Sequence, residues 1–404
     1  MKTIGRSLRM TSTAPGRKRL LRLAIGFVLV AFFFALAPGP SRGQLSTDDH
    51  LAEPGWWPRR KPADLKEFAG NAACAKCHSR IAASQKTTAM ARTLMRASDA
   101  DVLHSHADLA FRNGKYLYQI KPHGNTAQFT ITDGERTIAV DLVWAFGSGN
   151  LGQSYLFLEN GAYRESRATY FNSLQNLNFT PTRALLLPHD LNEAMSRPVG
   201  TSELLRCFSC HSLGANAGGK LDTSKASLGV TCEACHGPGL KHVQAMEASQ
   251  LQGGIGDEEG RKLIFNPGSL SPGDSVDFCG ACHGTWGDTK QAHTTGLASV
   301  RIQPYRLMSS RCWGDGDARL TCIACHNPHE PLSKDAAGYD SKCLACHVAS
   351  RTAKPTKELP GAACPVATKD CITCHMPKIE IPDMHTAFED HLIRVVRPGA
   401  PIPD

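Results

Sequence analysis

One long apolar stretch lies near the start of the chain. Residues 23–37 are apolar throughout, a basic cluster at residues 17–22 precedes them, and two prolines follow. This order is typical of an export signal, with Ser41 and Gly43 as the small residues before the cut. The apolar stretch is short for a membrane span. We therefore predict a signal peptide over residues 1–43, with an uncleaved N-terminal anchor as the alternative.

Runs of aromatic and β-branched residues occupy positions 107–172. Turn-forming pairs interrupt these runs, Asn-Gly at 113–114 and 160–161 and Asp-Gly at 133–134. Such pairs between strand-forming runs are the strongest short-range signal for β-hairpins. We predict a small antiparallel sheet here.

The remainder of the chain is rich in turn signals, for example at residues 214–229 and 252–277. This pattern predicts short helices joined by irregular loops. The expected fold is therefore mostly α with extensive irregular loops, plus a small antiparallel β insert.

The composition is unusual in two residue types, because the 404 residues include 16 cysteines and 17 histidines. Fourteen of the cysteines fall into seven copies of Cys-x-x-Cys-His, called motifs 1 to 7 below. In chain order the copies are Cys74/Cys77/His78, Cys207/Cys210/His211, Cys232/Cys235/His236, Cys279/Cys282/His283, Cys322/Cys325/His326, Cys343/Cys346/His347 and Cys371/Cys374/His375.

This pentapeptide is the attachment motif for c-type haem. Residues three apart on a helical turn share one face, so the two thiols can form thioethers to one porphyrin and the next histidine can bind its iron. A structural zinc site needs two cysteine pairs and no histidine at a fixed next position. A thioredoxin-like site needs one pair beside a βαβ unit, and disulfides would not place a histidine after every pair. We therefore predict seven covalent haems c.

The spacing of the motifs divides the chain. Motif 1 starts 133 residues before motif 2, whereas the other six start 21 to 47 residues apart. Segments this short cannot build separate hydrophobic cores, so the haems are expected to be the core. We predict a linker at 44–70, a first haem segment at 71–106, the β-rich insert at 107–172 and a six-haem cytochrome domain at 173–404. The insert is expected to be a docking platform or a scaffold that covers the first haem.

Six-coordination of seven irons needs seven ligands beyond the motif histidines. Ten histidines lie outside the motifs, namely His50, His104, His106, His123, His189, His242, His293, His329, His385 and His391. Ten candidates for seven positions allow every iron to have a sixth ligand. An iron without an open coordination position favours electron transfer over substrate binding. His50 and His123 stand in polar contexts and are expected to be surface residues.

Four histidines are the preferred distal ligands. His329 is too close to His326 to bind the same iron, so it is expected to reach a neighbouring haem, and the same is expected of His242. His385 and His391 follow the last motif and have few other apparent roles.

Met90 offers a sulfur ligand to the first haem. It lies twelve residues after His78, in residues 86–92, which are predicted to be helical. Its thioether is either a distal ligand, which would raise the reduction potential of that haem, or a packing group. The two cysteines outside the motifs, Cys312 and Cys364, are expected to form a disulfide, with free thiols or an intermolecular link as alternatives.

The formal net charge of +8 comes from the predicted signal. Residues 1–43 contain eight basic residues and no acidic residue, so the rest of the chain is neutral. A nucleic-acid partner therefore loses its electrostatic support. Membrane contact is expected only through an uncleaved N-terminal anchor.

The chain resembles multihaem c-type cytochromes of the group that includes hydroxylamine oxidoreductase and the tetrahaem cytochrome that accepts its electrons. The resemblance rests on Cys-Glu-Ala-Cys-His-Gly-Pro-Gly at 232–239 followed by His242, on Asn-Pro-His-Glu at 327–330, and on Met-Pro after motif 7. It implies closely stacked haem pairs, bis-histidine ligation from His242 and His329, and a periplasmic redox role. The chain has no Cys-x-x-Cys-Lys motif, so it lacks the lysine-ligated haem of pentahaem nitrite reductases.

These features predict an exported electron carrier, periplasmic or otherwise extracytoplasmic. It is expected to exchange electrons with redox partner proteins, with a quinol-oxidising membrane complex as one candidate. An enzymatic role stays open, since a multihaem oxidoreductase with one open haem that acts on a small nitrogen or sulfur compound is the alternative. A structural role, with haems stacked between subunits, is a third hypothesis.

Overall fold

The structure is a computed structural model that describes residues 64–181, 188–251, 258–313, 317, 319–350, 352, 354–357, 360–397 and 399–403. The predicted signal at residues 1–43 and His50 lie outside the described residues. Within the described ranges, no helix is both long enough and apolar enough to cross a membrane.

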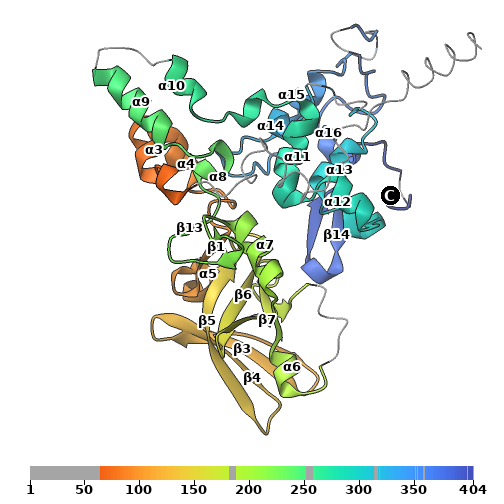
Figure 1. Cartoon of the computed structure of the whole chain (residues 1–404). Coiled ribbons are helices and arrows are strands. Elements are labelled where there is room, and N and C mark those ends of the chain that lie inside the picture. Colours follow the sequence, from red (N-terminus) through yellow and green to blue (C-terminus); the bar gives the residue numbers. More distant parts are fainter. Residues whose placement is uncertain are drawn as a thin grey trace, which may run out of the picture. The chain divides into compact units, whose positions relative to one another are not determined.

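The helices are mostly short (Figure 1). The α-helices are α3 (Asn71–Cys77), α4 (Ser79–Gln85), α5 (Asp101–Ser105), α6 (Leu191–Met195), α7 (Thr201–His211), α8 (Cys232–His236), α9 (Leu240–Leu251), α10 (Glu258–Lys262), α11 (Pro272–His283), α12 (Trp286–Gln291), α13 (Gln303–Met308), α14 (Cys322–Cys325), α15 (Asp340–Leu344) and α16 (Cys371–His375). Single 3-10 turns are η2 (Leu65–Glu67), η3 (Ala97–Asp99), η4 (Pro267–Ser269), η5 (Gly296–Ser299), η6 (Ala337–Tyr339) and η7 (Pro382–Met384).

The strands form one large sheet and three two-stranded ones. The large sheet contains β1 (Leu94–Arg96), β2 (Leu109–Asn113), β3 (Tyr116–His123), β4 (Thr126–Thr132), β5 (Thr137–Phe146), β6 (Gly152–Glu159), β7 (Ala162–Phe171), β8 (Asn176–Phe179) and β9 (Ser196–Pro198). The small pairs are β10 (Ser212–Leu213) with β13 (Ser227–Leu228), β11 (Asn216–Ala217) with β12 (Lys220–Leu221), and β14 (Lys378–Ile381) with β15 (Thr386–Glu389).

The large sheet has nine antiparallel strands and is nearly closed. Strands β2 to β8 follow in chain order, while β1 pairs with β5 and β9 pairs with β7. The two ends of this path meet, because the backbone N–H of Ala110 in β2 donates to Oδ1 of Asn176 in β8 at 2.8 Å. The rings of Phe111 and Phe179 lie 5.2 Å apart at the same junction.

The sheet corrects the predicted fold. The hairpins β2–β3, β4–β5 and β6–β7 turn at the predicted Asn-Gly and Asp-Gly pairs. The prediction of a mostly α chain with a small β insert is nevertheless wrong, since nine strands between residues 94 and 198 make a large sheet. Strands β1 and β9 add to it by pairing with strands that are distant in the chain, and β8 follows β7 after a short connection that holds no Asn-Gly or Asp-Gly pair.

The core of the sheet comes from alternate residues of its strands. Tyr118 and Ile120 of β3 and Phe129 and Ile131 of β4 are at most 1% exposed, and Ile120 faces Phe129 across the strand pair. This period of two is that of a strand with one buried face. The buried side chains of α6 join the same apolar cluster.

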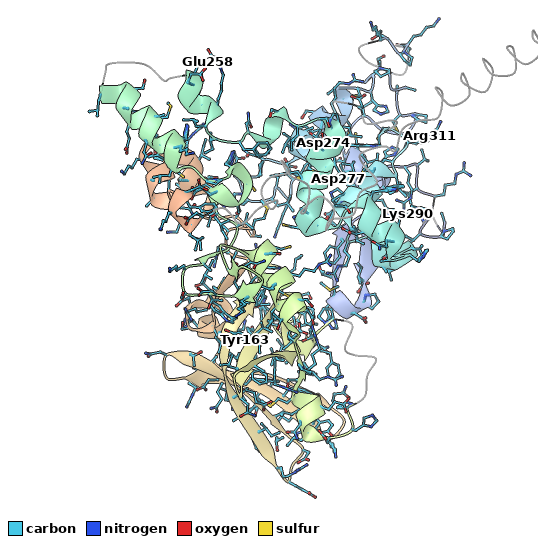
Figure 2. All side chains as sticks on the ribbon, viewed as in Figure 1. Tyr163, Glu258, Asp274, Asp277, Lys290 and Arg311 are labelled. Atoms are coloured by element: carbon cyan, nitrogen blue, oxygen red, sulfur yellow. The ribbon has the colours of Figure 1, made fainter. Side chains whose placement is uncertain are left out.

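The helix of motif 2 packs directly on this sheet. The ring of Phe208 in α7 meets the rings of Trp144 and Phe146 in β5 edge-on, at 5.5 and 5.3 Å. Trp144 donates its indole N–H to the hydroxyl of Tyr163 at 3.1 Å, and Figure 2 labels Tyr163 on the sheet. Leu204 of α7 is also buried in this cluster. The sheet therefore supports motif 2.

The segment with Met90 is not helical. Helix α4 ends at Gln85, and residues 86–92 form turns. The hydroxyl of Thr87 donates to the carbonyl of Ser84, and the hydroxyl of Thr88 accepts from the N–H of Ala91. Such side-chain bonds compete with the helix, so the helical prediction for this segment is wrong.

The turn around Met90 instead lies against the segment before motif 3. The N–H of Val230 donates to the carbonyl of Met90 at 3.0 Å. At Gly229, which has a φ of +74°, a Cβ would lie 1.9 Å from the carbonyl oxygen of Ala91. Only glycine permits this approach.

Candidate haem-binding sites

Each of the seven motifs contains a helical turn. Motifs 1 to 7 lie at α3, α7, α8, α11, α14, α15 and α16, in that order. In motifs 1, 5 and 6, the N–H of the histidine donates to the carbonyl of the first cysteine at 2.9 Å, the i to i−4 pattern of an α-helix. This geometry puts both thiols of a motif on one face, as two thioether bonds to one porphyrin require.

The first cysteines of six motifs meet in pairs. In the pair of motifs 1 and 3, the hydrogen bond to the Cys232 side chain raises the pKa of the Cys74 thiol. Motifs 1 and 3 are therefore neighbours in space although motif 2 lies between them in the chain, and the other two pairs join consecutive motifs. The three pairs are Cys74 with Cys232, Cys279 with Cys322, and Cys343 with Cys371.

The second cysteines of three motifs are exposed, whereas the other motif cysteines are partly covered. The exposed thiols are Cys77 of motif 1, Cys282 of motif 4 and Cys374 of motif 7. Contacts between motifs involve the first cysteine, and the second cysteine lies three residues later in each motif. Exposure leaves Cys282 and Cys374 accessible for thioether formation, so both stay candidate attachment residues.

Two carboxylates hold two of these motif pairs together. Glu233, between the cysteines of motif 3, is 2% exposed and accepts the N–H groups of residues 69–70 before α3, both at 2.8 Å. Asp340 in α15 accepts the N–H groups of Asp370 and Cys371 at the start of α16, at 2.7 and 2.8 Å. The bond from Cys371 holds the pKa of Asp340 below its ordinary value. Each carboxylate thus satisfies free donors at the start of a neighbouring motif helix.

Sequence reasoning missed both carboxylates. An acidic residue within or before a motif gives no signal by itself. Their role depends on which two motifs meet in the fold.

The remaining contacts connect the motif pairs. Burial and the neighbouring Cys343 raise the pKa of Cys325, so motif 5 lies near motif 6. The hydrogen bond to Cys322 and burial raise the pKa of Cys279 in motif 4, and the nearby Cys235 of motif 3 raises it further. Motif 2 joins motif 4, since the Cys210 Sγ lies 3.8 Å from a motif 4 carbonyl oxygen. All seven motifs therefore belong to one connected series.

Six rings of motif histidines and preferred distal ligands share one hydrogen-bond arrangement. In each, Nδ1 lies 2.8–3.0 Å from a backbone carbonyl oxygen. A carbonyl only accepts, so Nδ1 carries the proton and Nε2 keeps its lone pair for a metal. The rings and acceptors are His211 to Thr93, His236 to Phe265, His242 to Gly260, His347 to Ala362, His375 to Arg394 and His391 to Glu389.

Two motif histidines face a second histidine. The rings of His236 in motif 3 and His329 lie 5.9 Å apart and 11° from parallel. The rings of His326 in motif 5 and His391 lie 6.2 Å apart at 45°. An ion about 2 Å from a nitrogen of each ring would put the ring centroids about 6 Å apart, so the spacing of these residues fits two imidazoles that would hold one iron.

Burial favours the neutral form of these imidazole rings. Desolvation lowers the pKa of His326, His329 and His391, and also that of His283 in motif 4, near which His211 lies. A lowered pKa keeps the imidazole neutral at physiological pH, which is the form that binds a metal.

The other candidate ligands occupy less defined positions. His78 follows α3 and is exposed. His385 has a left-handed φ of 48°, and its ring lies 4.7 Å from that of Phe171 in the sheet. Met90 lies in the turn described above and is half-buried.

Three histidines bond within or beside the sheet instead. His104 uses Nε2 toward the carbonyl of Ser98 at 2.7 Å. His106 uses Nδ1 toward the carbonyl of Val102 and Nε2 toward Gln175. His123 pairs with an aspartate of β5 at 2.8 Å, and both side chains are more than half exposed.

The predicted disulfide is absent. Cys312 is a free thiol, so it is not bonded to Cys364. Burial raises its pKa, and the nearby Cys343 and Cys346 of motif 6 add to this shift. The described residues contain no group of three or more His, Cys, Asp or Glu side chains arranged around one metal ion.

Comparisons with known proteins agree with haem binding. Residues 182–237, which hold motifs 2 and 3, match the family model "Cytochrome c554 and c-prime". The match supports a c-type cytochrome with covalently bound haem that carries electrons. Such carriers generally work with redox partner proteins.

No curated protein matches the chain. Among solved structures, the crystal structure of the outer cell wall cytochrome OcwA is similar, with a TM-score of 0.47 and 16% identity over 82% of this chain and 80% of that chain.

Proposed function

We propose that this chain is an exported heptahaem c-type cytochrome that carries electrons between redox partner proteins. The observation that carries the proposal is the connected series of motifs, in which three pairs of first cysteines are in contact. Each bound haem supplies a reversible one-electron iron couple. The chain holds the attachment sites side by side, which is what transfer between neighbouring sites requires.

The proposed attachment residues are the cysteines of all seven motifs, the exposed Cys77, Cys282 and Cys374 included, and the proposed proximal ligands are the motif histidines. His329 is the proposed distal ligand opposite His236, and His391 is the one opposite His326, because their rings face each other. His242 is a further proposed ligand, since its Nδ1 is engaged by a carbonyl. His385 and Met90 are kept as candidate ligands without an assigned iron.

The division of the chain also stays a proposal. It comprises a signal or anchor at 1–43, a linker at 44–70, a first haem segment at 71–106, a β-rich segment at 107–172 and a six-haem segment at 173–404. The signal implies a location outside the cytoplasm. Two propionates per haem would make the neutral mature chain acidic, which favours partners with basic surfaces, and a quinol-oxidising membrane complex is one candidate donor.

A potentiometric titration followed by absorbance and paramagnetic resonance tests the proposal. An electron carrier of this kind takes up seven one-electron equivalents with low-spin signals. Uptake of fewer equivalents, or no haem absorbance, would contradict it.

One observation favours the alternative of an oxidoreductase with one open haem. His104, His106 and His123 are engaged near the sheet, which leaves His189, His242, His293, His329, His385 and His391 among the described residues for seven distal positions. A high-spin ferric signal that moves when nitrite, hydroxylamine or sulfite is added supports this alternative, and a wholly low-spin spectrum excludes it.

A further inference from the structure

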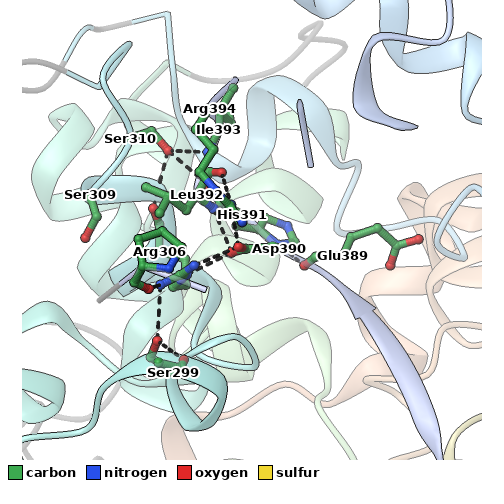
Figure 3. A network of polar contacts seen from close by, with 12 residues as sticks. Ser299, Arg306, Ser309, Ser310, Glu389, Asp390, His391, Leu392, Ile393 and Arg394 are labelled. Carbon is green, nitrogen blue, oxygen red and sulfur yellow. Dashed lines mark hydrogen bonds and ion pairs between the residues drawn. The ribbon is translucent and has the colours of Figure 1, made fainter. Parts of the chain in front are cut away.

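A buried ion pair lies beside one of the proposed ligand pairs. Arg306 of α13 binds Asp390 with two parallel bonds, Nε to Oδ1 at 2.8 Å and Nη2 to Oδ2 at 2.7 Å, and both side chains are 0% exposed. The remaining nitrogen of Arg306 donates to the carbonyl of Pro403 at 2.7 Å and to the hydroxyl of Ser299 at 3.3 Å. Figure 3 shows this network around Asp390 and His391.

The charges of this pair are closely compensated. Burial alone would raise the pKa of Asp390, but hydrogen bonds from Arg306 and the N–H of Leu392 lower it below its ordinary value. Arg394 adds a further bond to Asp390 Oδ2 at 2.5 Å. A buried, bidentate pair of this kind fixes geometry more than it adds stability.

The pair fixes a short segment, residues 389–394, that bears a proposed ligand. The hydroxyl of Ser310 donates to the carbonyl of His391 at 3.1 Å and accepts the N–H of Ile393 at 2.8 Å. The His391 ring donates from Nδ1 to the carbonyl of Glu389 at 3.0 Å. The backbone on both sides of His391 is thus held from α13 and the residues that follow it.

The same segment also reaches a second motif. The carbonyl of Arg394 accepts Nδ1–H of His375, the histidine of motif 7, at 2.9 Å. The N–H of Arg394 donates to the carbonyl of His375 at 3.2 Å. One short segment therefore orients the histidine that faces motif 5 and the histidine of motif 7.

We propose that Arg306 and Asp390 are positioning residues that set the axial ligands of two irons at once, those of motifs 5 and 7. They touch neither iron, and they act by holding residues 389–394 in place. The inference rests on the proposed function, because it assumes haem at both motifs. Partners of ligating histidines commonly change metal affinity 10- to 100-fold when they are removed.

The test compares Asp390→Asn with three other variants of the full, haem-loaded chain. Asp317→Asn is the matched control, since Asp317 pairs with Arg319 at the surface. His391→Ala removes one ligand only. Ser310→Ala is a milder change that keeps the ion pair, in case Asp390→Asn does not fold. Haem content and paramagnetic resonance are measured for each.

We expect Asp390→Asn to retain seven haems, to gain a high-spin ferric signal equal to one haem in seven, and to shift one further low-spin signal. Ser310→Ala should produce the same two changes at partial intensity. His391→Ala should produce the high-spin signal alone, and Asp317→Asn should match the parent.

Other outcomes overturn the inference. If Asp390→Asn and Ser310→Ala both match the parent while His391→Ala gains the high-spin signal, the positioning role is wrong and the proposed function stands. If the signals of all seven haems change, the pair has only a general structural role. If the parent itself lacks seven haems, the proposed heptahaem function fails first.

Discussion

The nine-stranded sheet and the motif-bearing segments are stabilised by different interactions. The sheet buries its own aromatic and aliphatic side chains, among them Tyr118, Phe129 and Tyr155 at 0% exposure. Around motifs 4 to 7, the apolar cluster of Val276, Leu307 and Trp313 is small. Here the order comes from carboxylate–backbone bonds, buried ion pairs and the proposed haems.

The two regions of this chain therefore depend on different sources of stability. Burial of apolar side chains stabilises the sheet whether or not a cofactor is present. The motif segments are too short to bury comparable surface by themselves. We therefore expect the two regions to respond differently to the same change.

The largest expected effect comes from preventing haem attachment. When the chain without its first 43 residues is produced in a cytoplasm that does not attach haem, the amides of strands β3 to β7 should stay protected from hydrogen exchange. Those of α14 to α16 should exchange rapidly, because metal or cofactor binding is coupled to folding where no core exists. Mass spectrometry of peptides measures both, and equal protection in the two regions would contradict the comparison.

The next effect concerns the core of the sheet. Phe129→Ala should lower the free energy of unfolding of the sheet by about 3–5 kcal/mol, because it removes a fully buried ring and leaves a cavity. Denaturant unfolding followed by far-ultraviolet circular dichroism measures this loss, with Thr130→Ala on the opposite face of β4 as the control. A change of the haem spectrum at low denaturant would mean that the two regions are not separate in stability.

A smaller effect is expected from the carboxylate that joins motifs 6 and 7. Asp340→Asn should lower the free energy of unfolding by less than Phe129→Ala does, because two backbone N–H groups lose a charged acceptor. It should also change the magnetic coupling within the pair of motifs 6 and 7, whereas Glu233→Gln should change that of motifs 1 and 3. Paramagnetic resonance distinguishes the two, with the exposed Asp383→Asn as the control, and identical spectra for both variants would speak against separate pairs.

The smallest effect belongs to an exposed histidine of the sheet. His123→Ala removes a surface ion pair with Asp141 and should change the free energy of unfolding by less than about 1 kcal/mol. Its spin-state spectrum should equal that of the parent, since the ring lies on the sheet. By contrast, His329→Ala should convert one haem to high spin, and a spectral change in His123→Ala would assign this histidine to an iron after all.

Local chemistry made part of the fold predictable. Asn160-Gly161 and the other turn pairs predict hairpins because glycine and asparagine adopt positive φ at low cost, and the structure has these hairpins. The closure of the sheet depends instead on contacts such as Ala110 with Asn176. These residues are far apart in the chain, and neither has a distinctive local pattern.

The candidate sites were also predictable only in part from the sequence. The motif cysteines and histidines follow from spacing, since the chemistry of attachment requires adjacent residues. Spacing does not predict how far each thiol is covered, as the exposed Cys282 and Cys374 show. The partners of the motifs do not follow from it either, because His391 faces His326 only after α13 and residues 389–394 have packed together.

The segment around Met90 shows how short-range bonds can override a predicted element. The hydroxyls of Thr87 and Thr88 bond the local backbone and replace the predicted helix with turns. Threonine can adopt either conformation, so the choice depends on the contact of this turn with the segment before motif 3.

The most direct test of the central claim is the intact mass of the purified, exported protein under denaturing conditions. We expect the mass of the polypeptide after residue 43, or of the whole chain if the anchor is retained, plus seven covalently attached haems. A mass equal to the polypeptide alone would contradict it.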